Sequence, residues 1–427
     1  MMNKLKFPEP TGFVAPGFER VLHVFRDNYK SGLETGSSFA AYYKGEPVVN
    51  IWGGLADWQV KSAWKEDTMG LFHSTTKFMA ALTIAHLVER DALNYGEKIS
   101  KYWPEFAQNG KENITLEQLL SCQAGLAALS DNFYLKWIKD DPQRLHNLLA
   151  RQKPLWSPGT AHGYHPITMG LYLNEIVKKV DKKGRTLSQY FQDEIAKPFG
   201  IEFYIGLPKS LYHRVTRLEP MKVDIKKLAE ILNNFQGDAE LYRLAFSQPQ
   251  DWFSTRILND ADFLELPISS SHGVGTALAV AKLMGIIANG GQHEGKVMLR
   301  PESINGLQMP LSHGTDLTLG NSQVYGRGTM LIPIVAGEKS WFMFGHTGYG
   351  EQIGAADSHY RTGFAYTTNR VYPSMDQLGM EIKWKSLATV LFQCIHEFEG
   401  VQIERMMLDT VEELEKNKRV LAQKCKL

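Results

Sequence analysis

Strand-like segments lie near both ends of this chain, and helix-like segments fill the middle. Residues 39–43 and 48–52 are rich in β-branched and aromatic side chains and flank Lys44-Gly45-Glu46-Pro47, which predicts a β-hairpin closed by Gly53-Gly54. Near the other end, the runs at 341–344 and 362–368 have the same character, and residues 352–356 between them can pair with the second run across a turn at 358–361. This distribution predicts an α/β (α+β) fold in which both ends of the chain build one antiparallel sheet flanked by helices.

The predicted helices fall mainly between these strand regions. After Ser74, apolar residues recur at helical spacing, which predicts a helix buried on most sides and ending near Asp91. Similar patterns predict helices at 116–122, 167–180, 187–196, 277–288, 382–398 and 402–423. We therefore expect a single unit over residues 1–427, in which 1–95 and 260–427 form the sheet part and 96–259 form a mainly helical insertion.

The composition excludes several classes of function. Of the 427 residues, 43% are hydrophobic, which is enough for a large buried core, and the formal net charge is only +1. Basic and acidic residues balance along the chain, so we expect no nucleic-acid partner. No uncharged apolar run reaches the length of about 18 residues that a membrane span requires. The first ten residues lack an apolar stretch, so we do not expect a secreted protein.

The cysteines and the last residues bear on compartment. Cys122, Cys394 and Cys425 are far apart and form no CxxC pair, so we expect neither a disulfide framework nor a zinc site. The chain ends in Cys425-Lys426-Leu427, which is similar to the Ser-Lys-Leu address read by the peroxisomal import receptor. It can equally be the chance end of a polar helix. A cytoplasmic and a peroxisomal location both stay open.

Two copies of a Ser-x-x-Lys motif carry the candidate chemistry. Ser62 to Lys65 lie in a polar stretch, whereas Ser74 to Lys77 open the apolar helix. Residues three apart share a helix face, which places Lys77 beside Ser74. A serine hydroxyl needs a base or a cation to become a nucleophile, and a desolvated lysine can act either as that base or as an electrostatic partner. The alternatives are that Ser74 only caps the helix and that Lys77 is an exposed first-turn lysine.

Motifs of competing enzyme classes are missing from the sequence. It contains no Gly-x-Ser-x-Gly elbow, which argues against an α/β-hydrolase. It also lacks a Walker A sequence, a dinucleotide fingerprint and a His-Glu-x-x-His pair. We therefore expect no cofactor and no metal.

Three motifs in order resemble those of a known superfamily. They are Ser74-Thr75-Thr76-Lys77, then Trp156-Ser157-Pro158-Gly159-Thr160 leading to Tyr164, then His346-Thr347-Gly348. This order resembles the serine β-lactamase and penicillin-binding-protein superfamily, in particular its class C-like branch, which includes esterases and D-aminopeptidases. The resemblance extends over roughly residues 11 to 400. Further matching segments are 116–121, 124–126, 163–166, 195–201, 344–350 and 356–357.

The resemblance implies a role for each matching residue. Ser74 would be acylated, and Lys77 would lie against it. Tyr164 would be a second basic group, with its pKa lowered by the lysine charge. The backbone N–H groups of Ser74 and Tyr349 would form the oxyanion hole, with Tyr349 following the third motif on an edge strand. His346, Thr347 and Gly348 would contact the substrate.

Two departures from the family pattern bear on the substrate. The β-lactamases have asparagine where this chain has Pro166, and lysine where it has His346, whose imidazole we expect to be partly charged near pH 7. Both changes disfavour β-lactams and peptidoglycan, so a carboxylesterase acting on small esters is the expected function. An amide, peptide or β-lactam hydrolase is one alternative, and a non-catalytic oligomeric scaffold is another. Intact Ser74, Lys77 and Tyr164 argue against the scaffold, and homo-oligomerisation stays open.

Overall fold

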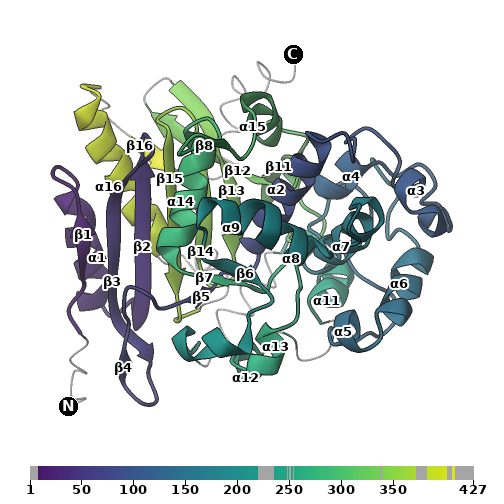
Figure 1. Cartoon of the computed structure of the whole chain (residues 1–427), viewed down its shortest axis with the longest axis horizontal. Coiled ribbons are helices and arrows are strands. Elements are labelled where there is room, and N and C mark those ends of the chain that lie inside the picture. The colour runs from purple at the N-terminus through teal and green to yellow at the C-terminus, as the bar shows by residue number, and fades with distance from the viewer. Residues whose placement is uncertain are drawn as a thin grey trace.

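A large antiparallel sheet forms the centre of the computed structural model, which describes residues 8–219, 235–247, 249, 252, 254–336, 339–371, 382–401 and 406–408. Its strand order is β1-β3-β2-β15-β14-β13-β12-β11-β10, with β4 paired to β3 and β16 paired to β12 (Figure 1). The first part of the chain contributes β1 (Thr11–Val14), β2 (Gly36–Tyr43), β3 (Glu46–Asp57) and β4 (Ser62–Ala63). The last part contributes β10 (Ser312–Thr315), β11 (Ser322–Tyr325), β12 (Met330–Ala336), β13 (Lys339–Gly348), β14 (Gln352–Asp357), β15 (Thr362–Thr368) and β16 (Met406–Leu408). The predicted fold class is therefore confirmed.

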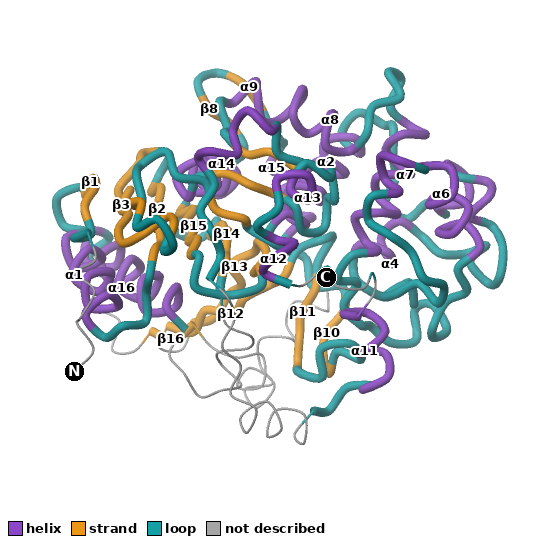
Figure 2. Tube along the Cα trace, turned by 90° about the horizontal axis from the view of Figure 1, so that it is seen from below, coloured by secondary structure: helices purple, strands orange, loops and turns teal. Residues whose placement is uncertain are grey.

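Helices cover both faces of this sheet. On one face, α1 (Glu19–Lys30) and α16 (Lys383–Phe398) pack side by side, as Figure 2 shows. On the other face, α14 (Ala277–Ala288) packs against β2, β14 and β15. Each face buries its own apolar cluster, and the larger cluster continues from α14 into the helical part of the molecule.

The helical part lies beside the sheet, at the side of α2 (Thr76–Val88) (Figure 1). It contains α3 (Ile99–Tyr102), η1 (Pro104–Phe106), α4 (Leu116–Leu120), α5 (Trp137–Asp140), α6 (Pro142–Arg151), α7 (Thr168–Val180), α8 (Leu187–Tyr190), the π-helix η2 (Phe191–Ala196), α9 (Lys197–Phe199), η3 (Lys209–Arg214), α11 (Ala239–Ser247), α12 (Thr255–Leu258) and α13 (Ala261–Leu264). The remaining elements are α15 (Pro301–Leu307), a small sheet of β5 (Gly70–Leu71), β7 (Gly273–Gly275) and β6 (Phe203–Ile205), and the hairpin of β8 (Gln292–His293) and β9 (Lys296–Val297). The domain boundaries proposed from the sequence stay a prediction.

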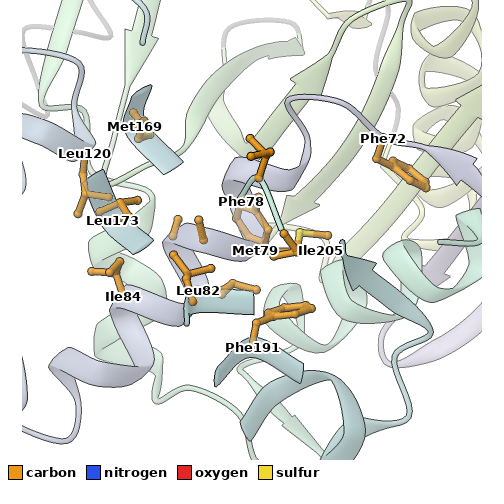
Figure 3. Close-up of a cluster of buried hydrophobic side chains, with 14 of the residues drawn as sticks. Phe72, Phe78, Met79, Leu82, Ile84, Leu120, Met169, Leu173, Phe191 and Ile205 are labelled. Carbon is orange, nitrogen blue, oxygen red and sulfur yellow. The ribbon is translucent and has the colours of Figure 1, made fainter. Parts of the chain in front are cut away.

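Helix α2 is the central element of the larger core. Every residue from Thr76 to Leu87 is buried, which explains why its sequence is apolar on nearly every side. Figure 3 shows Phe78, Met79 and Leu82 of this helix among side chains from other elements, including Leu120, Met169, Leu173, Phe191 and Ile205. Packing on all sides fixes the position of the turn that precedes the helix, and Ser74 lies in that turn.

Most predicted elements are present, with three differences. The β2–β3 hairpin forms across Lys44 and Gly45, both with positive φ, but β3 continues through Gly53-Gly54 to Asp57. The segment predicted as helix 187–196 is interrupted by the π-helix η2. The helix predicted at 402–423 is wrong at Met406–Leu408, which form β16 against β12, and its other residues lie outside the described part of the chain.

Candidate active site

Ser74 lies at the end of the turn before α2 and is half-buried. The helix begins at Thr76, and the backbone N–H of Lys77 donates to the Ser74 carbonyl oxygen at 2.9 Å. The side chain of Ser74 makes no capping bond, and its Oγ instead accepts a hydrogen bond from Lys77 Nζ at 3.2 Å. The capping interpretation is therefore wrong, and the hydroxyl is directed at the lysine.

Lys77 is buried inside the protein. Its Nζ also donates to the carbonyl oxygens of Pro166, at 2.7 Å, and Ser270, at 2.9 Å. The interpretation of Lys77 as an exposed lysine is therefore wrong. Because burial disfavours the ammonium, desolvation lowers the pKa of Lys77 to about 7. A substantial fraction of this lysine is an uncharged amine near neutral pH.

Tyr164 comes from the loop before α7 and completes a group of three. The centre of its ring is 4.7 Å from Lys77 Nζ, and its hydroxyl interacts with the Ser74 side chain. The expectation that the lysine lowers its pKa is wrong. Burial raises the pKa of Tyr164 well above its usual value, because the phenolate would lose its hydration. Tyr164 is thus a protonated phenol across the physiological range.

His346 lies on β13 with its side chain buried beside Tyr164, at 5.8 Å between ring centres. Its Nδ1–H donates to the Thr347 carbonyl oxygen at 2.6 Å. Burial, with a further contribution from the Lys77 charge, lowers the pKa of His346 to about 3. The expectation of a partly charged imidazole is therefore wrong, and His346 is neutral near pH 7.

The last residues of β13 extend beyond the neighbouring strand β12. β13 lies between β12 and β14, so the expectation of an edge strand is wrong for the strand as a whole. However, β12 begins at Met330, which pairs with Gly345. Residues 346–348 extend past that point and pair only with β14. The third motif therefore has a strand partner on one side only.

The end of β13 packs against the residues that precede Ser74. Gly348 approaches the carbonyl oxygen of Phe72 so closely that a Cβ there would overlap it. The Tyr349 ring meets the His73 ring edge-on, with the centres 5.6 Å apart. The two residues predicted to form the oxyanion hole, Ser74 and Tyr349, thus belong to segments in direct contact. Their role in the oxyanion hole stays a prediction.

Two residues near the site were not identified from the sequence. His73 has a left-handed backbone (φ 47°), a strained conformation for most residues other than glycine, although histidine adopts it more readily than most. Such strain often accompanies functional turns, and here it directly precedes Ser74. Asp316 contacts Tyr164 from a distant part of the chain. Only the position of His73 next to the motif could have pointed to it, and nothing in the sequence marked Asp316.

The remaining predicted residues lie away from this site or outside the described part of the chain. Ser62 is exposed on β4, and Lys65 is exposed after it. The Ser62–Lys65 copy of the motif therefore does not place a lysine beside a buried serine. Cys122 and Cys394 are buried free thiols. Cys425-Lys426-Leu427 lie outside the described residues, and their role in targeting stays a prediction.

Two kinds of structural feature are absent from the described ranges. Within them, no group of three or more His, Cys, Asp or Glu side chains is arranged to hold a metal ion. In the same ranges, no helix has the length and apolar character needed to cross a membrane.

The fold and the site define a class of protein. Serine β-lactamase-fold proteins have an antiparallel sheet with helices on both faces. Their active site combines the serine and lysine of a Ser-x-x-Lys motif, at the start of a buried helix, with a tyrosine. The Beta-lactamase family model matches residues 25–387, so the chain belongs to the Beta-lactamase family.

Individual relatives agree with this assignment. The Esterase/beta-lactamase LipL of Mycobacterium tuberculosis is 27% identical over 379 residues, which cover 84% of this chain and 83% of LipL. The crystal structure of a family VIII carboxylesterase is 30% identical with a TM-score of 0.80, covering 90% of this chain and 100% of that one. A penicillin-binding protein homolog from Caulobacter crescentus is 32% identical with a TM-score of 0.78, covering 90% and 99%. These relatives support a serine hydrolase of this fold.

Proposed function

We propose that this protein is a carboxylesterase that hydrolyses small esters through an acyl-enzyme on Ser74. The observation that carries the proposal is the 3.2 Å contact between Lys77 Nζ and Ser74 Oγ, in a site where burial lowers the lysine pKa to about 7. A base with a pKa near the working pH is the most effective kind for general base catalysis.

The carbonyl oxygens around Lys77 orient it for this role. An uncharged amine has two hydrogens and one lone pair. The carbonyl oxygens of Pro166 and Ser270 accept the two hydrogens, which leaves the lone pair directed at Ser74 Oγ. The amine then accepts the hydroxyl proton as Oγ attacks the ester carbonyl carbon.

The later steps use the other predicted residues. The backbone N–H groups of Ser74 and Tyr349 stabilise the oxyanion of the tetrahedral intermediate. When the bond to the leaving alcohol breaks, the Tyr164 phenol donates its proton to the departing oxygen and regains one from the Lys77 ammonium. Water then attacks the acyl-enzyme and passes a proton to the same groups, which return a proton to Ser74 Oγ as the acid leaves. The acyl-enzyme requires no metal and no cofactor.

Two features of the site favour simple esters over β-lactam and peptidoglycan substrates. Pro166 offers a carbonyl to Lys77 but no side-chain amide to a substrate. His346 is neutral and supplies no positive charge. The name of the family VIII carboxylesterase supports the same choice, whereas the name of LipL, an esterase/beta-lactamase, covers both kinds of substrate.

Labelling with a fluorophosphonate probe tests the proposal. The adduct should be located on Ser74 by mass spectrometry, and Ser74→Ala should abolish both labelling and hydrolysis of a short-chain ester. Ser62→Ala is the matched control, because Ser62 is an exposed serine of the same motif type. Labelling at another serine, or ester hydrolysis by Ser74→Ala, would overturn the assignment. A chromogenic cephalosporin tested in parallel would reveal β-lactam hydrolysis.

A further inference from the structure

Tyr164 is held by two residues outside the three motifs. Asp316 directly follows β10, and Tyr325 is the last residue of β11. Both side chains are buried. Neither belongs to a segment that the sequence marked as functional, yet both contact Tyr164.

The Asp316 carboxylate fixes the backbone of the tyrosine loop. Its Oδ1 accepts hydrogen bonds from the Tyr164 N–H at 3.0 Å, the Thr318 N–H at 2.8 Å and the Leu319 N–H at 2.7 Å. The same loop is tied a second time, because the Leu317 N–H donates to the His162 carbonyl oxygen at 3.0 Å. Residues 316–319 and 162–164 therefore form one connected structure.

The other carboxylate oxygen of Asp316 is connected to the Tyr164 ring through Tyr325. Asp316 Oδ2 accepts a hydrogen bond from the Tyr325 hydroxyl at 2.7 Å. The Tyr325 ring in turn lies nearly parallel to the Tyr164 ring, with centres 6.3 Å apart and an angle of 12° between the planes. A single buried carboxylate thus fixes the Tyr164 backbone directly and its ring through Tyr325.

We propose that Asp316 is a positioning residue for Tyr164, acting on its backbone by hydrogen bonding and on its ring through Tyr325. The inference rests on the proposed function, in which the Tyr164 hydroxyl transfers a proton. A misplacement of about 1 Å in such a group can reduce the rate by up to about a hundredfold. The negative charge of Asp316 also adds to burial in keeping Tyr164 protonated.

The test compares Asp316→Ala, its conservative counterpart Asp316→Asn, and a matched control. Asp357 is an equally buried aspartate that accepts hydrogen bonds from Trp341 Nε1, at 2.9 Å, and from the backbone N–H groups of His359 and Tyr360. Asp357→Ala should therefore cause a similar loss of stability without a change in kcat. Asp316→Ala should lower kcat by about tenfold or more with little change in KM. Asp316→Asn should retain most of the wild-type kcat, because the amide oxygen can still accept hydrogen bonds from the three N–H groups.

A double-mutant cycle with Tyr164→Phe shows whether the effect runs through the tyrosine. Removing the hydroxyl should cost about a hundredfold on its own. In that background, Asp316→Ala should cost less than about twofold more, because the group that it positions is gone. An equal loss in both backgrounds, or the same fall in kcat for Asp357→Ala, would overturn the proposal. If Asp316→Ala does not fold, Tyr325→Leu replaces it, since that variant removes the ring contact and leaves the three N–H bonds.

Crystal structures of the variants separate this inference from the proposed function. If Tyr164→Phe retains full activity, the proposed role of Tyr164 in acylation is wrong. The positioning role of Asp316 is then tested by the location of the Tyr164 ring in the structure of Asp316→Ala. A displaced or rotated Tyr164 ring would support the positioning role. A ring in the same place would overturn it.

Discussion

The Lys77 amine lies 4.7 Å from the centre of the Tyr164 ring, and burial moves the pKa values of these two groups in opposite directions. It lowers the pKa of Lys77 to about 7 and raises that of Tyr164 above its usual value. Two titratable neighbours whose pKa values are driven apart can divide the roles of base and acid. Here the lysine is the group that loses its proton near neutral pH, and the tyrosine is the group that keeps it.

The pH dependence of catalysis follows from this division. Below pH 7 most Lys77 is protonated and cannot accept the Ser74 proton, so kcat/KM should rise as pH increases through about 7 and level off above it. The measurement is kcat/KM for a neutral ester between pH 5.5 and 9. Lys77→Arg, which keeps its proton throughout, should be inactive at every pH. A flat wild-type profile across pH 7 would exclude Lys77 as the base.

The same pKa predicts a pH dependence of stability. The folded protein releases the Lys77 proton at a pH of about 7, whereas the unfolded chain retains it up to about the ordinary lysine pKa of 10.5. Between these values the unfolded state binds more protons, so the Lys77 contribution to stability rises with pH, by at most about 1.4 kcal/mol per pH unit. Urea unfolding at pH 6.5 and 8.5 should show the wild type gaining stability relative to Lys77→Met. An unchanged difference would show that Lys77 titrates outside this range.

The neutral state of His346 predicts how charge selectivity depends on pH. Because the pKa of His346 is about 3, its imidazole stays uncharged from pH 5 to 8. The ratio of kcat/KM for a neutral ester to that for a matched sulfonate-bearing ester should therefore remain constant over this range. A ratio that narrows as pH falls through about 6.5, the ordinary histidine value, would show that His346 does become charged.

The contact between Gly348 and Phe72 predicts a sensitive glycine. A Cβ at Gly348 would overlap a backbone oxygen two residues before Ser74, so Gly348→Ala should shift the turn and lower kcat/KM by about tenfold or more. Gly96→Ala is the control, because its Cβ would meet only Asn94 Oδ1 at an ordinary 3.6 Å. The two variants should differ in kcat/KM far more than in expression. Equal activities would mean that the turn tolerates the displacement.

The sequence was sufficient for the fold class and for bringing Ser74, Lys77 and Tyr164 together. Strand pairing follows from alternating side chains and turn residues, and the three motifs are local patterns. Ionisation could not be predicted in the same way. The expected lowering of the Tyr164 pKa and the expected partial charge of His346 were wrong because desolvation, which depends on the whole surrounding structure, dominates both. Asp316 carried no signal, since its bond to Tyr164 joins positions 152 apart in the sequence.

The interleaving of the two chain ends in one sheet has a consequence for biosynthesis. β2 pairs with β15. The hydroxyl of Tyr366, on β15, donates a hydrogen bond to the Glu34 carboxylate, which is 332 positions away in the sequence. The ribosome must therefore synthesise most of the chain before β15 can pair with the free edge of β2. Such high contact order slows folding, and until it is complete the open strand is a site for aggregation. Nascent chains that stop before β15 should depend on chaperones, and full-length chains should acquire the Ser74 site only late in folding.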